Sequence, residues 1–315
     1  MQMEASWNLG KLLTVFVVVL TVFGVLPLFL GRFQVVLVTE ALILGVYALS
    51  FDLIFGYAGM LSFGQSIFFG VGAYTILYSF KGGLGLAVSL LLAVFVAGFF
   101  GLLVGGAIVR IKGAKFFLVT LVGSILFYLL ALDNRWLTGG SDGMVVPTVF
   151  PGLAENYYLV LGVSVTAILF ALILVRSPLG LVLKMIRDNE RRAGLLGYSL
   201  KKYKVITFTI GGGIAGLAGG LYAYTSGFVS AGFFHWTRSA DAVVWTILGG
   251  AGTVVGPFLG AALLTVVSDI LSAVVGNIYP VVVGALLVLA VVVFPRGVFG
   301  LLEGTIRNWK GDSGG

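Results

Sequence analysis

The sequence predicts an all-α protein that crosses a membrane many times. Of its 315 residues, 59% are hydrophobic and only 10% are charged, whereas soluble domains are about 25% charged. Apolar runs of about 20 residues, the length a helix needs to span a bilayer, recur along the chain. The length leaves room for about eight to ten such helices. We therefore interpret residues 1–315 as one transmembrane domain and exclude a water-soluble protein.

The first half begins with the apolar run 12–30, which is too long for a signal-peptide core and is expected to be a retained span. The next predicted spans are 33–53, 56–80 (broken by glycines), 84–109 and 114–132. A basic cluster, Arg110, Lys112 and Lys115, follows residue 109. Because Lys and Arg concentrate in cytoplasmic loops, this cluster and the N-terminus are expected in the cytoplasm.

In the second half, the net acidic segment 133–156 is expected outside, and 227–240 is expected to be a short external loop rich in aromatic residues. The predicted spans here are 157–175, 205–225, 241–264, 264–275 and 278–294. No clear polar break separates 241–264 from 264–275, so a half-helix at 241–248 remains open. We favour a cytoplasmic C-terminus.

The segment 176–204 is the one long stretch that is both charged and helix-like, and it contains eight of the 19 Lys and Arg residues. Each would cost roughly 2.5–3.5 kcal/mol at a bilayer centre, so the segment lies in the cytoplasm. Ser177 and Pro178 predict a helix start, Gly197 its end and Ser199 the cap of the next helix. The residues at helical spacing are Val182, Met185, Ile186, Asn189, Ala193 and Leu196. This amphipathic helix is suited to contact a cytoplasmic partner, although a loop that only fixes topology is the alternative.

Motifs for covalent chemistry are absent from the sequence. The Gly10-Lys11 pair lacks the remainder of a nucleotide-binding loop. The chain has no cysteine and one histidine, His235, which excludes a cysteine- or histidine-based metal centre. We expect no enzyme and no bound cofactor, so that any ATP and Mg²⁺ would be bound by partner subunits.

Glycine is abundant, at 47 residues, and one pattern occurs in both halves. Asp52 precedes the Gly-x-Ala-Gly element 56–59, and Asp241 precedes the similar element 249–252. Transporters often place broken helices at matching positions of two repeats. An internal repeat and a chance match both remain open.

Four segments together resemble a known family. They are GYAGMLSFGQSIFFGVGAYT (56–75), LTGGSDG (137–143), SPLGLVLKMIRDNERRAGLLGYSLKKYK (177–204) and ILGGAGTVVGPFLGA (247–261). In this order they look like the membrane permease of ABC importers of the branched-chain amino acid type, specifically its M-type permease subunit. The resemblance covers about residues 33–302 and implies a fold like that of type II ABC importer permeases.

The resemblance implies that 176–204 docks into a groove of the ATPase and passes its movement to the pore. The implied ATPase-coupling residues are Pro178, Lys184, Arg187, Asp188, Asn189, Glu190, Arg191 and Gly197. Arg191 and Arg192 depart from the small residues that often follow this Glu in the family, which puts the partner affinity in doubt.

The resemblance also implies a discontinuous helix at 56–75 along the translocation path, with a glycine-rich packing helix as the alternative. Candidate path residues are Gly56, Tyr57, Gly59, Ser62, Gln65, Tyr74 and, as an intramembrane acid, Glu40. Candidate residues of the extracytoplasmic mouth are Thr138, Gly139, Gly140 and Asp142, unless these simply cap a turn. Asp52 is expected to reach the membrane interface, and His235 and Trp236 to belong to an aromatic belt.

The expected function is that of a permease subunit of an ATP-driven importer of branched-chain or other hydrophobic amino acids, working by alternating access. The resemblance implies a second homologous permease, two cytoplasmic ATPases and an extracytoplasmic binding protein, in the plasma (inner) membrane of a bacterium or archaeon. No nucleic-acid partner is expected. The alternatives are an importer of urea, short amides or aromatic acids, and a channel or ion-coupled carrier without an ATPase.

Overall fold

The computed structural model describes residues 23–147, 152–278, 281 and 284–285. Most of the predicted span 12–30, almost all of the span 278–294 and the C-terminal segment lie outside the described residues. Five helices within the described part are long and apolar enough to cross a membrane. They are α2 (Arg32–Asp52, continued to Tyr57 by the π-helical turn η2, Leu53–Tyr57), α4 (Leu86–Ile108), α5 (Ala114–Asp133), α7 (Leu153–Arg176) and α10 (Leu200–Ser226).

Shorter elements connect or complete these spans. The helices are η1 (Leu26–Leu28), α3 (Gln65–Lys81), α6 (Arg135–Thr138), α8 (Pro178–Asp188), α9 (Glu190–Leu195), η3 (Ala231–Phe234), α11 (Trp236–Gly249), α12 (Gly256–Val275) and η4 (Gly276–Ile278). Two short strands, β1 (Met144–Val145) and β2 (Phe228–Val229), pair antiparallel. The all-α, polytopic fold predicted from composition is confirmed.

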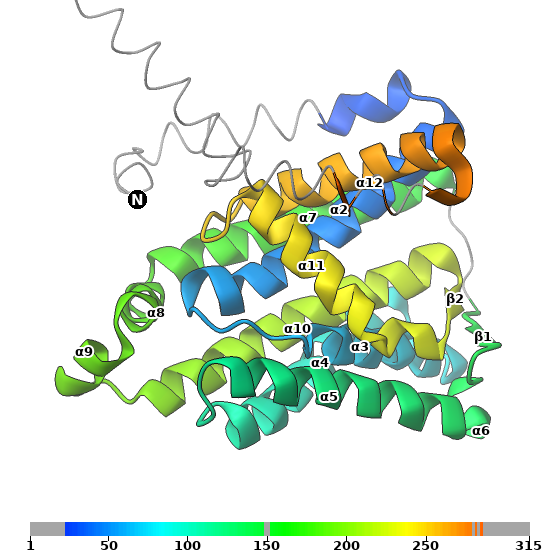
Figure 1. Ribbon diagram of the computed structural model, residues 1–315. Coiled ribbons are helices and arrows are strands. Elements are labelled where there is room, and N and C mark those ends of the chain that lie inside the picture. Colours follow the sequence, from blue (N-terminus) through cyan, green and yellow to red (C-terminus); the bar gives the residue numbers. More distant parts are fainter. Residues whose placement is uncertain (1–22, 148–151, 279–280, 282–283, 286–315) are drawn as a thin grey trace, which may run out of the picture.

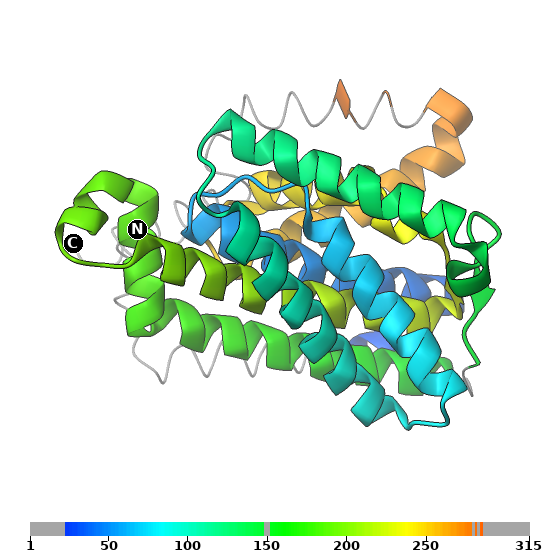
Figure 2. The ribbon, with the colours of Figure 1, turned by 90° about the horizontal axis from the view of Figure 1, so that it is seen from below.

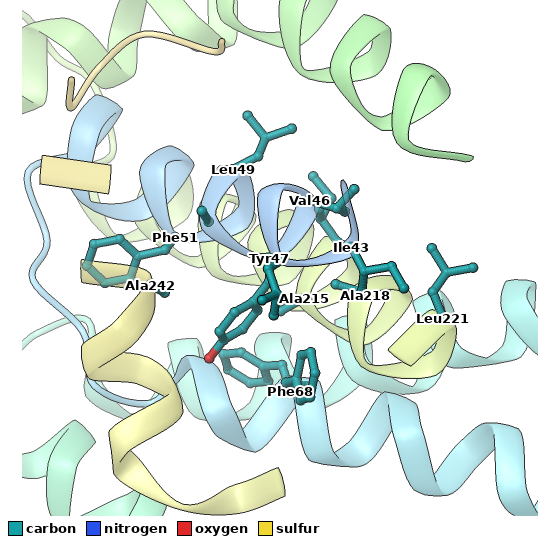
Figure 3. Packing of buried hydrophobic residues seen from close by; sticks show 14 of the residues in the cluster. Ile43, Val46, Tyr47, Leu49, Phe51, Phe68, Ala215, Ala218, Leu221 and Ala242 are labelled. Atoms are coloured by element: carbon teal, nitrogen blue, oxygen red, sulfur yellow. The ribbon is translucent and has the colours of Figure 1, made fainter. Parts of the chain in front are cut away.

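The helices differ in how much of their surface the protein covers. In α2 and α10, 67% of the most apolar 18-residue stretch is buried, whereas in α5 only 22% is buried. A helix that is apolar on all sides but poorly covered by protein faces lipid. The bundle is therefore organised around α2 and α10, with α4, α5 and α7 presenting apolar surface outward. Figure 3 shows the buried side chains between these two central helices and their neighbours, including Tyr47 on α2 and Phe68 on α3.

Helix α10 packs against α3 and α4 at very short range because glycines line the contact. A Cβ atom added at Gly216 would lie 2.2 Å from the Cβ of Ala97 on α4. One added at Gly72 on α3 would lie 2.0 Å from the carbonyl oxygen of Gly216. Small residues let helix backbones approach closely inside a membrane, and this contact depends on them.

The two ends of the bundle differ. Helices α8 and α9 protrude at one end, and α6, β1 and β2 lie at the other (Figures 1 and 2). Because the basic segment 176–204 contains α8 and α9, their end is the cytoplasmic one. The strand pair joins the segment after α6 to the segment after α10 on the external side.

The break expected in the span 56–80 is present: η2 ends at Tyr57, residues 58–64 are not helical, and α3 starts at Gln65. The region after α10 does not follow the predicted spans. The predicted external loop 227–240 is wrong in its second half, because α11 already begins at Trp236. The predicted boundary at residue 264 is also wrong, because a turn at 250–255 separates α11 from α12. The half-helix at 241–248, which the sequence left open, is present as part of α11.

Candidate translocation path and coupling joint

Two short helices begin next to each other inside the bundle. The backbone N–H of Ser66, in the first turn of α3, donates to the Oγ of Ser239 in the first turn of α11 (2.9 Å). The Oγ of Ser66 also bonds the Oγ of Ser124 (3.2 Å), which lies near the middle of the spanning helix α5. The two helix starts, called here the midmembrane junction, therefore lie at about the middle of the membrane.

The midmembrane junction is lined by buried polar groups. Gln65 is fully buried, its Nε2 lies 3.4 Å from the Oγ of Ser50 on α2, and its Oε1 has no hydrogen-bond partner among the described residues. The backbone N–H of Phe63 donates to the Oγ1 of Thr120 (3.0 Å), which gives the unwound segment 58–64 a partner. Unpaired backbone is costly in a membrane unless it is buried in protein or lines a wet cavity. The positive ends of two helix dipoles also meet here.

The first turns of α11 carry charge on an exposed surface. Thr237 and Asp241 are exposed, Arg238 is half-buried, and Trp236 is 37% exposed. The ring of Trp236 lies 6.4 Å from that of Phe63, two residues before the start of α3. A charge facing lipid at this depth would cost roughly 2.5–3.5 kcal/mol. This face of α11 must therefore meet water or a protein partner.

Glu40, predicted as an intramembrane acid, is linked to α11 through Tyr222. The hydroxyl of Tyr222 donates to the Oε1 of Glu40 (3.1 Å), and the guanidinium of Arg238 lies 5.4 Å from the centre of the Tyr222 ring. Glu40 also borders a cavity of about 150 Å³. The other residues that line this cavity are Val36, Thr39, Leu153, Asn156, Tyr222, Thr225 and Ser226.

The cytoplasmic ends of α2 and α11 meet α8 in what is called here the coupling joint: Asp52, Gly56, Arg187 and Gly252. Arg187 of α8 donates from Nη1 to the carbonyl oxygen of Gly56. Asp52 is fully buried and its Oδ1 accepts from the backbone N–H of Gly252 (2.7 Å). The expectation that Asp52 reaches the membrane interface is therefore wrong, because the glycine turn after α11 covers it.

Glycine is required at the coupling joint by space and by conformation. A Cβ atom on Gly56 would lie 1.9 Å from Asp52 Oδ1 and 2.4 Å from the N of Gly252. Gly252 has a φ of +81°, which side chains rarely adopt, and a Cβ there would lie 2.5 Å from Arg187 Nη1. The two Gly-x-Ala-Gly elements are thus in direct contact. With regard to an internal repeat, the two elements differ in position: the first follows the full span α2, whereas the second follows the short helix α11.

The cytoplasmic segment forms two helices, so the prediction of one helix ending at Gly197 is wrong. Helix α8 starts after Ser177 with Pro178 in its first turn, as predicted, and ends at Asp188. Asn189 then caps α9, its side chain accepting from the N–H of Arg192 (2.9 Å). Ser199 stands at the start of α10 but makes no side-chain cap.

Glu190 ties α9 to the membrane helices. It pairs with the buried Lys204 of α10 (2.8 Å) and with Lys112 (3.4 Å). Partial burial raises the pKa of the Glu190 carboxyl, but the hydrogen bond and charge of Lys204 and the charge of Lys112 outweigh it and hold the pKa below its ordinary value. Glu190 is therefore ionised at neutral pH and contacts its own chain.

The cytoplasmic tip combines charge with exposed apolar side chains. Leu195 is 81% and Leu196 64% exposed, and the neighbouring Arg191 and Arg192 are exposed as well. Lys184, by contrast, lies over the ring of Tyr57 (5.4 Å) at the end of η2. The predicted coupling residues thus divide into an inner group on the bundle, which includes Lys184, Arg187 and Glu190, and an outer group. The outer group contains Asp188, Asn189, Arg191 and Gly197.

At the external end, two groups of predicted residues come together. The hydroxyl of Tyr74 on α3 donates to the carbonyl oxygen of Thr138 (2.8 Å), and Thr138 is itself buried. Gly139 and Gly140 both have positive φ, and Asp142 is exposed. A cavity of about 550 Å³ opens beside Tyr74. Its other lining residues are Val71, Thr75, Tyr78, Ser79, Leu84, Phe100, Phe127, Leu137, Thr138 and Phe234.

Sequence reasoning missed Ser66, Arg238 and Ser239 as members of one site. The segment Thr-Arg-Ser-Ala-Asp at 237–241 resembles a loop because it is polar and lies between apolar runs. His235, which stands at the N-cap position of α11, is not a residue type that marks a helix start. The available signal was the spacing of Thr237 and Asp241, four positions apart, which continues into the apolar run.

Comparison with known proteins gives consistent matches. Residues 34–291 match the family model described as "Branched-chain amino acid transport system / permease component". The chain is 30% identical to the high-affinity branched-chain amino acid transport system permease protein LivM of Escherichia coli (strain K12), over 95% of this chain and 78% of that protein.

Two further relatives are more distant. The chain is 25% identical to the permease protein LivH of Salmonella typhimurium, covering 81% of this chain and 91% of the relative. It is 26% identical to a probable LivM of Methanocaldococcus jannaschii, covering 72% and 77% respectively. No solved structure matches significantly. With its apolar spanning helices, the chain is an integral, multi-pass inner-membrane protein.

Proposed function

Because this chain belongs to the family of branched-chain amino acid transport permease components, we propose that it is the permease subunit of an ATP-driven importer of branched-chain or other hydrophobic amino acids. The observation that carries the mechanism is the coupling joint, in which Arg187 of a protruding cytoplasmic helix contacts Gly56 at the end of a broken transmembrane segment. The chain itself is not an enzyme, and partner subunits would hydrolyse ATP.

The coupling joint supplies a mechanical route into the membrane. Each of the two segments that start at the joint ends at the midmembrane junction: 58–64 leads from Gly56 to α3, and α11 leads from Gly252 back to Ser239. A displacement of α8 pulls on both through Arg187. We expect this pull to separate α3 from α11 and to switch the side on which the path is open.

The two ends of the molecule present surfaces that suit the proposed partners. The exposed leucines and arginines of α9 provide an apolar and basic surface for a cytoplasmic ATPase, one on each of two permeases. Relatives named LivM and LivH both match this chain, which supports pairing with a second, different permease. The external segment around Thr138 and Asp142 is suited to receive a substrate-binding protein.

The competing function, a channel or ion-coupled carrier, would need an intramembrane acid free to bind an ion. The two acids that the sequence singled out for this role are engaged: Glu40 accepts from Tyr222, and Asp52 accepts from Gly252. A further acid, Asp241, is exposed, but its charge interacts with that of Arg238. An importer of urea, short amides or aromatic acids would share the coupling joint and would differ only in its substrate.

The proposed function is tested by comparing two arginines of one segment in the complex purified from its native membrane. Arg187→Ala should leave the ATPase bound and hydrolysing ATP but reduce leucine uptake about tenfold, since the hydrogen bond to Gly56 from a charged donor is worth about 1.5–3 kcal/mol. Arg191→Glu, on the exposed tip, should instead reduce recovery of the ATPase. Unchanged ATP-driven uptake in Arg187→Ala would refute the route through the coupling joint, and recovery of this chain without any ATPase would refute the importer.

A further inference from the structure

The first turns of α11 combine a cation, an anion and an aromatic surface at the depth of the midmembrane junction. Arg238 and Asp241 are three positions apart on the helix, which places them side by side, and their charges interact. Asp241 is exposed and Arg238 half-buried, so both reach the surface of the chain. Trp236 directly precedes Thr237, and its ring lies 6.4 Å from that of Phe63.

This surface cannot face lipid, because a charge in lipid at this depth is costly. The described part of the chain leaves Asp241 exposed and Arg238 half-buried. Its depth is fixed by Ser239, which lies between the two charged residues and accepts from Ser66 at the start of α3. The charged face therefore flanks the point at which the two broken helices meet.

Resting on the proposed function, we propose that Arg238 and Asp241 bind the charged groups of a zwitterionic α-amino acid as it passes the midmembrane junction. Arg238 takes the α-carboxylate, because a guanidinium presents five N–H donors in a planar fork that matches a carboxylate. Asp241 takes the α-ammonium group as an acceptor of charged hydrogen bonds.

The neighbours of the pair hold it in place and limit what else it binds. Arg238 is kept on this face by the ring of Tyr222 at 5.4 Å, whose hydroxyl is fixed by Glu40. A ligand with only a carboxylate would leave Asp241 without its cation, and a ligand with only an amine would leave Arg238 without its anion. The site thus selects an α-amino acid over urea, amides and aromatic acids that lack the pair of charges.

The chain contains no cysteine, so single thiols can report on this surface without background. Thr237→Cys, one turn from Asp241, should react with a membrane-impermeant thiol reagent in the assembled importer held in nanodiscs. Leu103→Cys on α4, also exposed but on an apolar outward face, is the matched control and should not react. L-Leucine should slow the labelling of Thr237→Cys. Neither 4-methyl-2-oxopentanoate, which lacks the amine, nor 3-methylbutylamine, which lacks the carboxylate, should do so.

The charge assignments are then tested in the Thr237→Cys background. Asp241→Asn and Arg238→Gln should each weaken protection by leucine about tenfold, the change expected for one lost charged hydrogen bond. The conservative Asp241→Glu and Arg238→Lys variants guard against loss of folding and should retain most of the protection. Equal protection by leucine in Asp241→Asn and Arg238→Gln would overturn the proposal, as would an unreactive Thr237→Cys.

Leucine uptake by the wild-type complex shows whether a negative result rules out the binding site alone or the proposed function as well. If the wild type imports leucine with ATP but leucine does not protect Thr237→Cys, the headgroup site is wrong while the proposed function stands. If the wild type does not import leucine, the proposed substrate class and the site fall together.

Discussion

The contact of α10 with α4 and the contact of α3 with α11 both lie at the centre of the bundle, but they are built in opposite ways. In the first, two continuous helices approach through glycine and alanine, as Gly216 does against Ala97. In the second, two helices begin at the contact and are held by hydroxyls, Ser66 with Ser239 and Ser124. Closely packed apolar helices fit together in only one arrangement. A few hydrogen bonds between helix ends can instead be broken and replaced by others when the helices move.

This difference indicates which parts of the molecule move. We interpret α4 and α10 as a fixed frame, and 58–64 with α11 as the moving parts that the coupling joint drives. A substitution in the frame should therefore affect folding. A substitution at the coupling joint or the midmembrane junction should affect transport first.

The largest effect is expected in the frame. Gly216→Leu places a side chain where a Cβ already comes within 2.2 Å of Ala97, so the α4–α10 contact must separate. Overpacking of this kind costs about 1–3 kcal/mol or more and should abolish recovery of folded protein. The control is Gly162→Leu on α7, where nothing lies within 4 Å. Size-exclusion chromatography in detergent measures both, and a folded Gly216→Leu protein would break the distinction drawn here.

At the coupling joint, Gly252→Ala should leave the protein folded but reduce transport. Alanine at its φ of +81° is strained by about 1–2 kcal/mol, and its Cβ meets Arg187. Gly83→Ala has a similar positive φ of +76° with nothing within 4 Å, so it isolates the effect of the contact. Leucine import per ATP hydrolysed should fall several-fold in the first variant only. An equal fall in both would mean that strain, and not the joint, is responsible.

A smaller effect is expected at the midmembrane junction. Ser239→Ala removes the acceptor for the Ser66 N–H at the start of α3, a cap worth about 1 kcal/mol. Because this contact holds the two broken helices together, we expect higher ATP hydrolysis without substrate and a leak of leucine through the complex. Ser272→Ala, which alters an exposed hydroxyl on α12, should have neither effect. Basal ATPase rate and leucine efflux from proteoliposomes report the difference.

The smallest effect is expected in the pH dependence of the stability of α9 in the cytoplasmic segment. The pKa of Glu190 lies below its ordinary value of 4.5, so its pairing with Lys204 stabilises α9 fully above about pH 4.5 and is lost as pH falls through the lowered pKa. The protection factors of the α9 amides, which correct hydrogen exchange for its intrinsic pH dependence, should fall over that range and be constant from about pH 5 to 7. Lys204→Gln should remove the dependence. Lys112→Gln should reduce it only slightly, because Lys112 is 67% exposed.

Much of this architecture could be predicted from the sequence, since membrane helices are specified locally by apolar length and flanking charge. The start of α8 followed from Ser177 and Pro178. Its end did not: Asn189 fits the helical spacing, but its side chain caps the next helix instead. The residues of 56–59 were expected near a break, and the break is present between Tyr57 and Gln65.

What the sequence could not reveal depends on contacts between distant segments. Asp52 is buried only because Gly252, 200 positions later, turns over it. Arg238 resembles a loop residue until α11 is placed inside the bundle beside Tyr222. In each case the local sequence is compatible with the membrane surface, and only the tertiary contact moves the residue inside. The roles of the candidate site residues remain predictions.

The measurement that tests the central claim most directly is ATP-driven leucine uptake by a disulfide-locked variant of this cysteine-free chain. Ser66→Cys with Ser239→Cys locks α3 to α11, where the N of Ser66 lies 2.9 Å from the Oγ of Ser239. If the midmembrane junction must open, the oxidised variant takes up no leucine, and a reductant restores uptake. Full uptake through a completely oxidised Ser66–Ser239 pair would contradict the account.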